Sequence, residues 1–300
     1  MIPGTGPGNG GYATMATNGR DAVGRGSSSS VAHAPSHPHL TARQRRRLWI
    51  STQPGAWMMV LAPGLAGTII AGVLALRFGA SASSVWLRDL WLLLAWALCY
   101  CVQFTAARWL VSRRVHRYLT PMIVYGVALA VVGLPLVVIH SAILWWAPVY
   151  LVLAGLSLWA AYTHRERSLW ANAADVVAAS LIGAIAGSAV AGFRPSDIPR
   201  AALVAAMAFL MVEYGSALFV KTMIRKFGDP RYHILSVLWH AAMAAAGFLV
   251  QPLWGAIAVV LLLRAIMLPM RSERIRPLYV GVEEGVVLAV AFVVILIGVL

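Results

Sequence analysis

The chain has 300 residues, of which 60% are hydrophobic and only 11% are charged, and its mean hydropathy is +0.78. Soluble domains carry about 25% charged residues, so this composition excludes that class. The formal net charge of +14 does not indicate nucleic-acid binding, because most basic residues lie in the short gaps between apolar runs. The composition therefore predicts a polytopic membrane protein whose first partner is the lipid bilayer.

The first 42 residues differ in composition from the rest of the chain. They are rich in Gly, Pro, Ser and His and show no hydrophobic periodicity, which is typical of a disordered segment. Arginines crowd positions 43–47, directly before the first apolar run, and such residues hold a segment in the cytoplasm. We expect a disordered cytoplasmic tail at 1–42 and a transmembrane domain at 43–300.

Nine apolar runs follow one another from residue 55 onward, each bounded by charged residues or proline. A helix needs roughly 20 apolar residues to cross a hydrocarbon core about 30 Å thick. The sequence therefore predicts an all-α membrane protein with nine transmembrane helices. Their expected bounds are 55–76, 87–107, 119–139, 141–162, 169–192, 201–220, 234–250, 252–270 and 279–300.

The distribution of Lys and Arg tests the number of helices. With the N-terminus inside, nineteen basic residues lie in the tail and in the gaps after helices two, four, six and eight. The opposite face receives only four, which are Arg77, Arg88, Arg194 and Arg200. Cytoplasmic loops of membrane proteins carry such an excess of basic residues. One helix more or fewer would move every later loop to the opposite side of the membrane and remove this asymmetry. We therefore expect a multi-pass protein with its N-terminus in the cytoplasm.

Several spans contain ionisable or amide side chains, which membranes tolerate only when these are paired, protonated or exposed to water. Five of them lie seven or eight residues from the cytoplasmic end of their span, a depth of about 10 to 12 Å. A shared depth favours one polar pocket that opens to the cytoplasm. Its predicted members are Asn172, Asp175, Glu213, His240, Arg264, Glu283 and Glu284, with Gln103 as a weaker candidate.

The roles of these residues are left open by the sequence. Arg264 is expected to pair with one carboxylate, because an unpaired guanidinium at that depth is costly. The surplus acids could be proton or cation acceptors, and His240 an acid or base. Alternatively, the acids pair with arginines and only lock helices together. Gly183 and Gly187 predict close packing of the fifth helix, which would bring Asp175 near His240.

The gaps after helices two and six are strongly basic, and the second of them contains a Gly-Asp-Pro turn signal at 228–230. Lys221, Arg225 and Arg231 could bind an anionic head group at the mouth of the pocket. The alternative is that these residues only set orientation and contact anionic lipids. No metal site is predicted, and no cofactor is indicated.

Four stretches of the chain resemble the YwiC-like family of bacterial integral membrane proteins. They are QPGAWMMVLAPGLAG at 53–67, THRERSLWANAADVVA at 163–178, VKTMIRKFGDPRYHILSVLWH at 220–240 and RPLYVGVEE at 276–284. The resemblance implies a bacterial cytoplasmic membrane protein and supplies no mechanism. A histidine that the family carries before Gly-Ala-Trp is replaced here by Pro54.

A weaker architectural likeness connects the chain with the UbiA prenyltransferases. That superfamily is similar in having nine helices, an inside N-terminus and a polar chamber near the cytoplasm. Its two aspartate-rich motifs hold magnesium and a prenyl diphosphate, and they follow helices two and six. The corresponding gaps here are basic, and Asp229 is their one acidic residue. The resemblance therefore does not extend to metal-dependent prenyl transfer.

Two functions follow as hypotheses. The first is a protein, whether or not an enzyme, that handles a lipid or small molecule in the cytoplasm-facing pocket. The second is a proton- or cation-coupled transporter, because intramembrane acids mark ion pathways. Against transport, no internal repeat divides the nine spans into equal halves. The substrate, and whether the protein is an enzyme, cannot be read from the residues.

Overall fold

The computed structural model describes residues 48–51, 54–112, 115–270 and 275–300. The tail predicted at 1–42 lies outside these residues. Within the described ranges all regular secondary structure is helical, and nine helices are long and apolar enough to cross a membrane. The predicted class and the number of spans are confirmed, whereas the orientation in the membrane remains a prediction.

The long helices are bounded by short irregular or 3₁₀ segments. A 3₁₀ segment, Ser141–Trp146, leads into α5, and a π-helical segment, Lys221–Arg225, extends α7. The helices are α2 (Pro54–Arg77), α3 (Ala82–Val111), α4 (Leu119–Ile139), α5 (Ala147–Tyr162), α6 (Leu169–Gly187), α7 (Arg200–Val220), α8 (Pro230–Val250), α9 (Pro252–Met267) and α10 (Pro277–Val299).

Several predicted boundaries were wrong by four residues or more, among them the end of α3, which was predicted at 107 and lies at Val111. α3 begins at Ala82 rather than at 87, so Arg88 and Asp89 lie beyond its first turn and not at its start. α8 begins at Pro230 rather than at 234, because Asp229 caps its first turn by accepting from the Arg231 N–H at 3.1 Å. α6 ends at Gly187 rather than at 192, and the chain then turns through a positive φ of 84° at Gly192.

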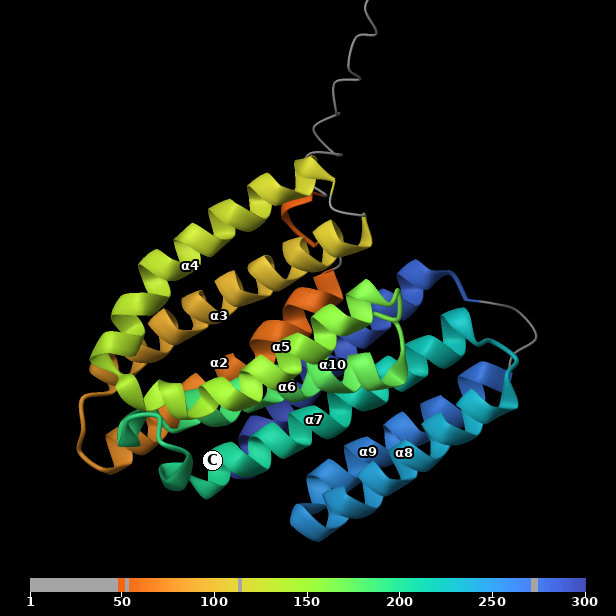
Figure 1. The fold of residues 1–300 in the computed structure, drawn as a ribbon. Coiled ribbons are helices and arrows are strands. Elements are labelled where there is room, and N and C mark those ends of the chain that lie inside the picture. The colour runs from red at the N-terminus through yellow and green to blue at the C-terminus, as the bar shows by residue number, and fades with distance from the viewer. Residues whose placement is uncertain (1–47, 52–53, 113–114, 271–274) are drawn as a thin grey trace, which may run out of the picture. The chain divides into compact units, whose positions relative to one another are not determined.

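α2 lies at the centre of the described helices and packs against α3, α6, α7 and α10. α4 and α5 pack against α3, whereas α8 and α9 form an antiparallel pair beside α7 and α10 (Figure 1). The helices run alongside one another, and their connections fall at two ends (Figure 1). The basic gaps lie at one of these ends, which we call the inner end. The other is called the outer end.

Glycines permit the closest helix contacts. A Cβ added to Gly183 of α6 would lie 2.6 Å from the carbonyl oxygen of Pro63 in α2, so only glycine fits there without a shift. A Cβ added to Gly187 would lie closer still to the Cβ of Ala202 in α7. In α8, Gly247 meets the backbone of Gly255 in α9. The close packing predicted for the fifth helix is confirmed, and its partners are α2 and α7.

Aromatic donors connect neighbouring helices through backbone carbonyl groups. Such oxygens can accept a second hydrogen bond beside their helical one, which matters in an environment without water. The donors reach across at 2.8 to 3.0 Å. They are Trp91 to Val132, Trp96 to Val60, Tyr150 to Ala178, Trp239 to Met211 and Trp254 to Val294.

Candidate functional site

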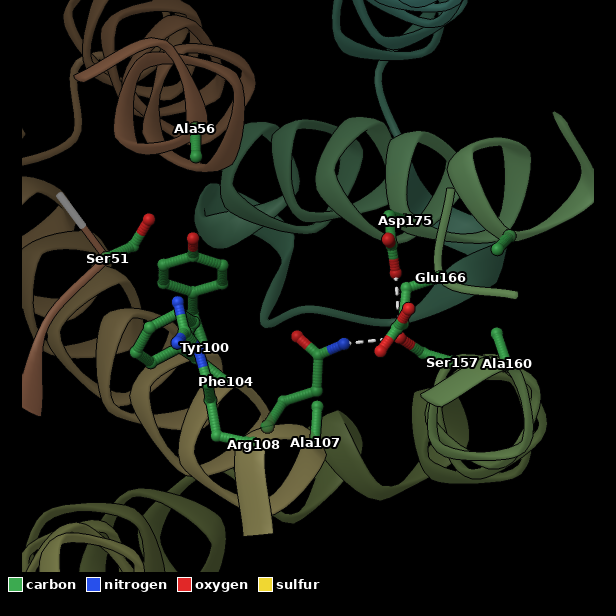
Figure 2. A pocket seen from close by; sticks show the side chains of 12 residues that line it. Ser51, Ala56, Tyr100, Phe104, Ala107, Arg108, Ser157, Ala160, Glu166 and Asp175 are labelled. Carbon is green, nitrogen blue, oxygen red and sulfur yellow. Dashed lines mark hydrogen bonds between the residues drawn. The ribbon is translucent and has the colours of Figure 1, made fainter. Parts of the chain in front are cut away.

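A cavity of about 300 Å³ lies at the inner end, among α2, α3, α5 and α6 (Figure 2). Its volume is at the lower limit of known ligand pockets, which span about 300–1,000 Å³. We call it the inner pocket. Four alanines, one on each helix, leave space for the cavity because their side chains are small. The remaining lining side chains are mainly polar, charged or aromatic. The alanines are Ala56, Ala107, Ala160 and Ala171.

A chain of hydrogen bonds ends on Asp175. Gln103 of α3 donates through Nε2 to the hydroxyl of Ser157 in α5. Ser157 donates in turn to Oδ1 of Asp175 in α6, at 3.0 Å. A carboxylate has about four acceptor positions, so this single donor leaves most of them available. The Asp175 side chain lines the pocket and is exposed there, which suits it to meet a ligand.

The α3 wall of the pocket carries an aromatic face with a cation on it. Tyr100, Phe104 and Arg108 are four residues apart and therefore share one side of the helix. The guanidinium carbon of Arg108 lies 5.1 Å from the centre of the Phe104 ring, within the range of a cation–π contact. Tyr100 is held by Trp57 of α2, whose ring packs edge-on at 5.0 Å.

The loop between α5 and α6 closes the pocket and contributes Glu166. Lys221, at the end of α7, donates through Nζ to the carbonyl oxygen of Arg167 at 2.7 Å. The same ammonium lies 5.4 Å from the ring centre of Tyr232. Since Lys221 is buried, its contact fixes the residue that follows Glu166. It thereby stabilises the loop beside the pocket.

Arg264, Glu283 and Glu284 form a second polar group, between α9 and α10. The Arg264 guanidinium lies 2.7 Å from Glu284 and 3.6 Å from Glu283. Its carbon also lies 3.9 Å from the ring centre of Phe219 in α7. The expectation that Arg264 pairs with a carboxylate is confirmed, and within the described residues these are the ion pairs that form.

His240 and Glu213 lie in the interior, next to other helices. His240 Nδ1 lies 2.7 Å from the carbonyl oxygen of Ser236. Because a carbonyl only accepts, Nδ1 carries the proton, and in the neutral ring Nε2 is the acceptor. A Cβ added to Gly215 of α7 would lie 3.3 Å from that Nε2. Glu213 is fully buried, and neither oxygen has a hydrogen-bond partner among the described residues.

The seven residues predicted to share one pocket are therefore distributed over several places. Asp175 is the member that lines the inner pocket, and Asn172 lies one turn before it on α6, partly buried. Asp175 contacts α5 whereas His240 lies against α7, so the packing of α6 gives them different partners. Sequence position indicated only the depth of each side chain along its helix. The seven residues are separated because their side chains point from their helices in different directions.

The three cations predicted to bind an anionic head group differ in exposure. Lys221 is buried and already bonded to the α5–α6 loop, whereas Arg225 and Arg231 are exposed at the inner end. A head group would therefore meet the two arginines first. That assignment remains a prediction.

A second cavity, of about 540 Å³, lies at the outer end beside the start of α5. Ser141, Trp145, Arg194 and Ser196 line it. The adjacent Phe193 has a φ of 69°, which is uncommon for a bulky residue, and the indole of Trp146 donates to its carbonyl oxygen at 2.8 Å. Burial, together with the nearby Arg88 guanidinium, lowers the pKa of His140 at this end.

Sequence analysis missed Asp89 as an intramembrane acid. Asp89 is fully buried in α3 and has no hydrogen-bond partner among the described residues. It was missed because the span was expected to begin at 87, which placed Asp89 at the membrane surface. Tyr100 and Ser157 were also missed, although the four-residue spacing of Tyr100, Phe104 and Arg108 on one helical face could have indicated the α3 wall.

Comparison with known proteins agrees with the resemblance seen in the sequence. The family described as YwiC-like protein matches residues 50–187, a range that contains α2 to α6 and all residues that line the inner pocket. A relative from Haemophilus influenzae (strain KW20 / Rd), described as an uncharacterized protein, is 26% identical over 255 residues. The match covers 85% of this chain and the whole of that protein. No solved structure matches, and the likeness to the UbiA prenyltransferases remains a prediction.

Proposed function

We propose that this YwiC-like membrane protein binds a small polar molecule or a lipid head group in the inner pocket. Asp175 is the anchor of the ligand. The observation that carries the proposal is the hydrogen-bond chain from Gln103 through Ser157 to Asp175, which ends on a carboxylate exposed in a cavity. Structural hydrogen bonds between helices need no cavity, whereas a binding site does.

The position of the pocket supports access from the cytoplasm. The pocket lies at the inner end, where the basic gaps gather (Figure 1), and an excess of basic residues is typical of the cytoplasmic side. Arg225 and Arg231 are exposed at the same end and can attract an anionic group before it reaches the pocket. The whole pocket falls within the range that matches the family.

The proposal is tested by native mass spectrometry of the purified full chain with its co-purified lipids and small molecules. Asp175→Asn keeps the size of the side chain and removes its negative charge, so a bound species should be lost. Asp197→Asn is the matched control, because Asp197 lies in an exposed loop at the outer end. Retention of the same species in Asp175→Asn would contradict the proposal.

A proton- or cation-coupled transporter is the second candidate. Asp89 and Glu213 favour it, since both carboxyl groups are fully buried without a hydrogen-bond partner among the described residues. Intramembrane acids of this kind mark ion pathways. Proteoliposomes with an internal pH-sensitive dye distinguish the candidates. If the protein is a transporter, the wild type should show a proton flux that Glu213→Gln abolishes. If it binds a ligand without transport, the wild type and Glu213→Gln should show the same proton leakage.

A further inference from the structure

The charges of the inner pocket lie on two opposite walls. Arg108 extends from α3 beside Phe104 and Tyr100, whereas Asp175 and Glu166 lie together on the other side, toward Ser157 (Figure 2). The three residues of the α3 wall share one face of that helix. The two acids come from α6 and from the loop that precedes it. The pocket therefore has a positive wall and a negative wall.

Arg108 has unused binding capacity. Its side chain is exposed, its guanidinium stacks on Phe104, and it forms no ion pair within the described ranges. A guanidinium carries five N–H donors in a fixed planar arrangement that fits phosphate and carboxylate groups. The Phe104 ring orients this donor set without consuming any of it. Arg108 can therefore bind an anionic group at the α3 wall.

The opposite wall has acceptor capacity to match. Asp175 accepts one hydrogen bond, from Ser157, and Glu166 makes no ion pair with any described residue. Two carboxyl groups at one wall repel an anion and favour an ammonium group, which has three donors. A ligand with only a negative charge would meet repulsion from Asp175 and Glu166. A ligand with only a positive charge would leave Arg108 unmatched.

We infer that the inner pocket takes a zwitterion, with its ammonium group against Asp175 and Glu166 and its phosphate or carboxylate group against Arg108. This inference rests on the proposed function and names the ligand class. The cavity of about 300 Å³ suits a group of head-group size. An ethanolamine phospholipid and a free aminoalkyl phosphate present the same chemistry, so either source satisfies the two walls.

The experiment measures binding of defined probes to the full chain in detergent and in nanodiscs. The probes are free phosphoethanolamine, phosphatidylethanolamine and the anionic phosphatidylglycerol. Wild-type protein should bind the ethanolamine probes at least 10-fold more tightly than phosphatidylglycerol, a ratio that corresponds to one charge-assisted contact. Binding of free phosphoethanolamine identifies a soluble ligand, whereas binding of the phospholipid alone identifies a head group. Both results support the inference.

Two variants should have different effects, one on selectivity and the other on affinity for all phosphate probes. Asp175→Asn removes one ammonium contact and should bring the affinity for phosphatidylethanolamine toward that for phosphatidylglycerol. Arg108→Gln should weaken the binding of every phosphate probe by about 10-fold. Arg108→Lys keeps the positive charge and should keep the preference for ethanolamine probes over phosphatidylglycerol. Arg194→Gln and Asp197→Asn, both at the outer end, are the matched controls. They should change neither the affinity for phosphate probes nor the preference for ethanolamine probes. Thermal unfolding of each variant checks that it is folded.

The outcomes separate the inference from the function on which it rests. Equal wild-type affinity for phosphatidylethanolamine and phosphatidylglycerol would overturn the zwitterion, although the pocket would still bind a ligand. The zwitterion would also be overturned if Arg108→Gln left every affinity unchanged in a folded protein. Absence of any bound species and of any probe binding would overturn the proposed function itself.

Discussion

The hydroxyl of Ser157 in α5 donates to Oδ1 of Asp175 in α6 across 3.0 Å, and this contact joins two helices at the edge of the inner pocket. Ser157 also accepts from Gln103 of α3. One small side chain therefore connects three helices, and it orients the carboxylate that we propose as the ligand anchor. Its removal is the mildest way to disturb the site.

Ser157→Ala removes the donor to Asp175 and the acceptor for Gln103. We expect ligand affinity to fall by about 5-fold to 10-fold, because one hydrogen bond to a charged group contributes roughly 1 kcal/mol or more. Titration of the co-purified ligand into the variant measures the change. Ser84→Ala, in the exposed first turn of α3 at the outer end, should leave the affinity unaltered. An equal loss in both variants would show that the effect does not pass through Asp175.

Gly183→Ala should destabilise the protein, because its new Cβ would lie 2.6 Å from the Pro63 carbonyl oxygen. Overpacking of this kind costs about 1–3 kcal/mol. The thermal unfolding temperature in detergent should therefore fall. Gly126→Ala in α4 is the control, since nothing lies within 4 Å of its added Cβ and alanine favours the helix. A fall of similar size at Gly126 would contradict the assigned α2–α6 contact.

Glu283 and Glu284 are adjacent but should differ in their contribution to stability. Glu284→Ala leaves Arg264 largely buried without its 2.7 Å partner, and loss of one partner from a buried pair costs roughly 3–5 kcal/mol. Glu283 is more exposed and lies at 3.6 Å, so Glu283→Ala should cost about 1 kcal/mol or less. Denaturant unfolding of the two variants gives the comparison. Equal losses would mean that Arg264 does not prefer Glu284.

The orientation expected from the basic residues can be tested with single cysteines. Cys99→Ser and Cys101→Ser provide the background, and Ala80→Cys or Arg165→Cys then adds one thiol in a connection at either end of the helices. A membrane-impermeant maleimide should label position 80 in intact cells and position 165 only after permeabilisation. The reverse pattern would place the inner end outside and would remove the argument for cytoplasmic access.

Helix number could be predicted from the sequence because length, hydropathy and the sign of the flanking charges act independently on each span. Boundaries were less certain where a charged residue lay inside a helix. The second span was expected to begin at 87, which placed Asp89 near its start, yet the structure encloses Asp89 seven residues after Ala82. Residues 189–192 are apolar and indicated a longer α6, but the backbone turns at Gly192 and Phe193 through positive φ angles.

The candidate site was only partly predictable, and the reason is geometric. Position along a helix sets the depth of a side chain, so Asp175 could be placed near the inner end. Its neighbours depend on how each helix is rotated about its own axis, and packing decides this rotation. Gly183 and Pro63 bring α6 against α2, which leaves Asp175 to face Ser157. No pattern within α6 contains that information.

The π-helical turn after α7 brings two lysine side chains to the same side of the chain. Its bond from the Lys226 N–H to the Lys221 carbonyl oxygen spans five residues, and the ammonium groups of Lys221 and Lys226 both lie close to Tyr232, at 5.4 and 5.3 Å from the ring centre. In a regular α-helix, residues five apart point about 140° away from each other. Without the π-helical turn, the two ammonium groups would therefore point to different flanks of the helix. Spacing, as much as the number of lysines, thus determines where this protein concentrates its charge.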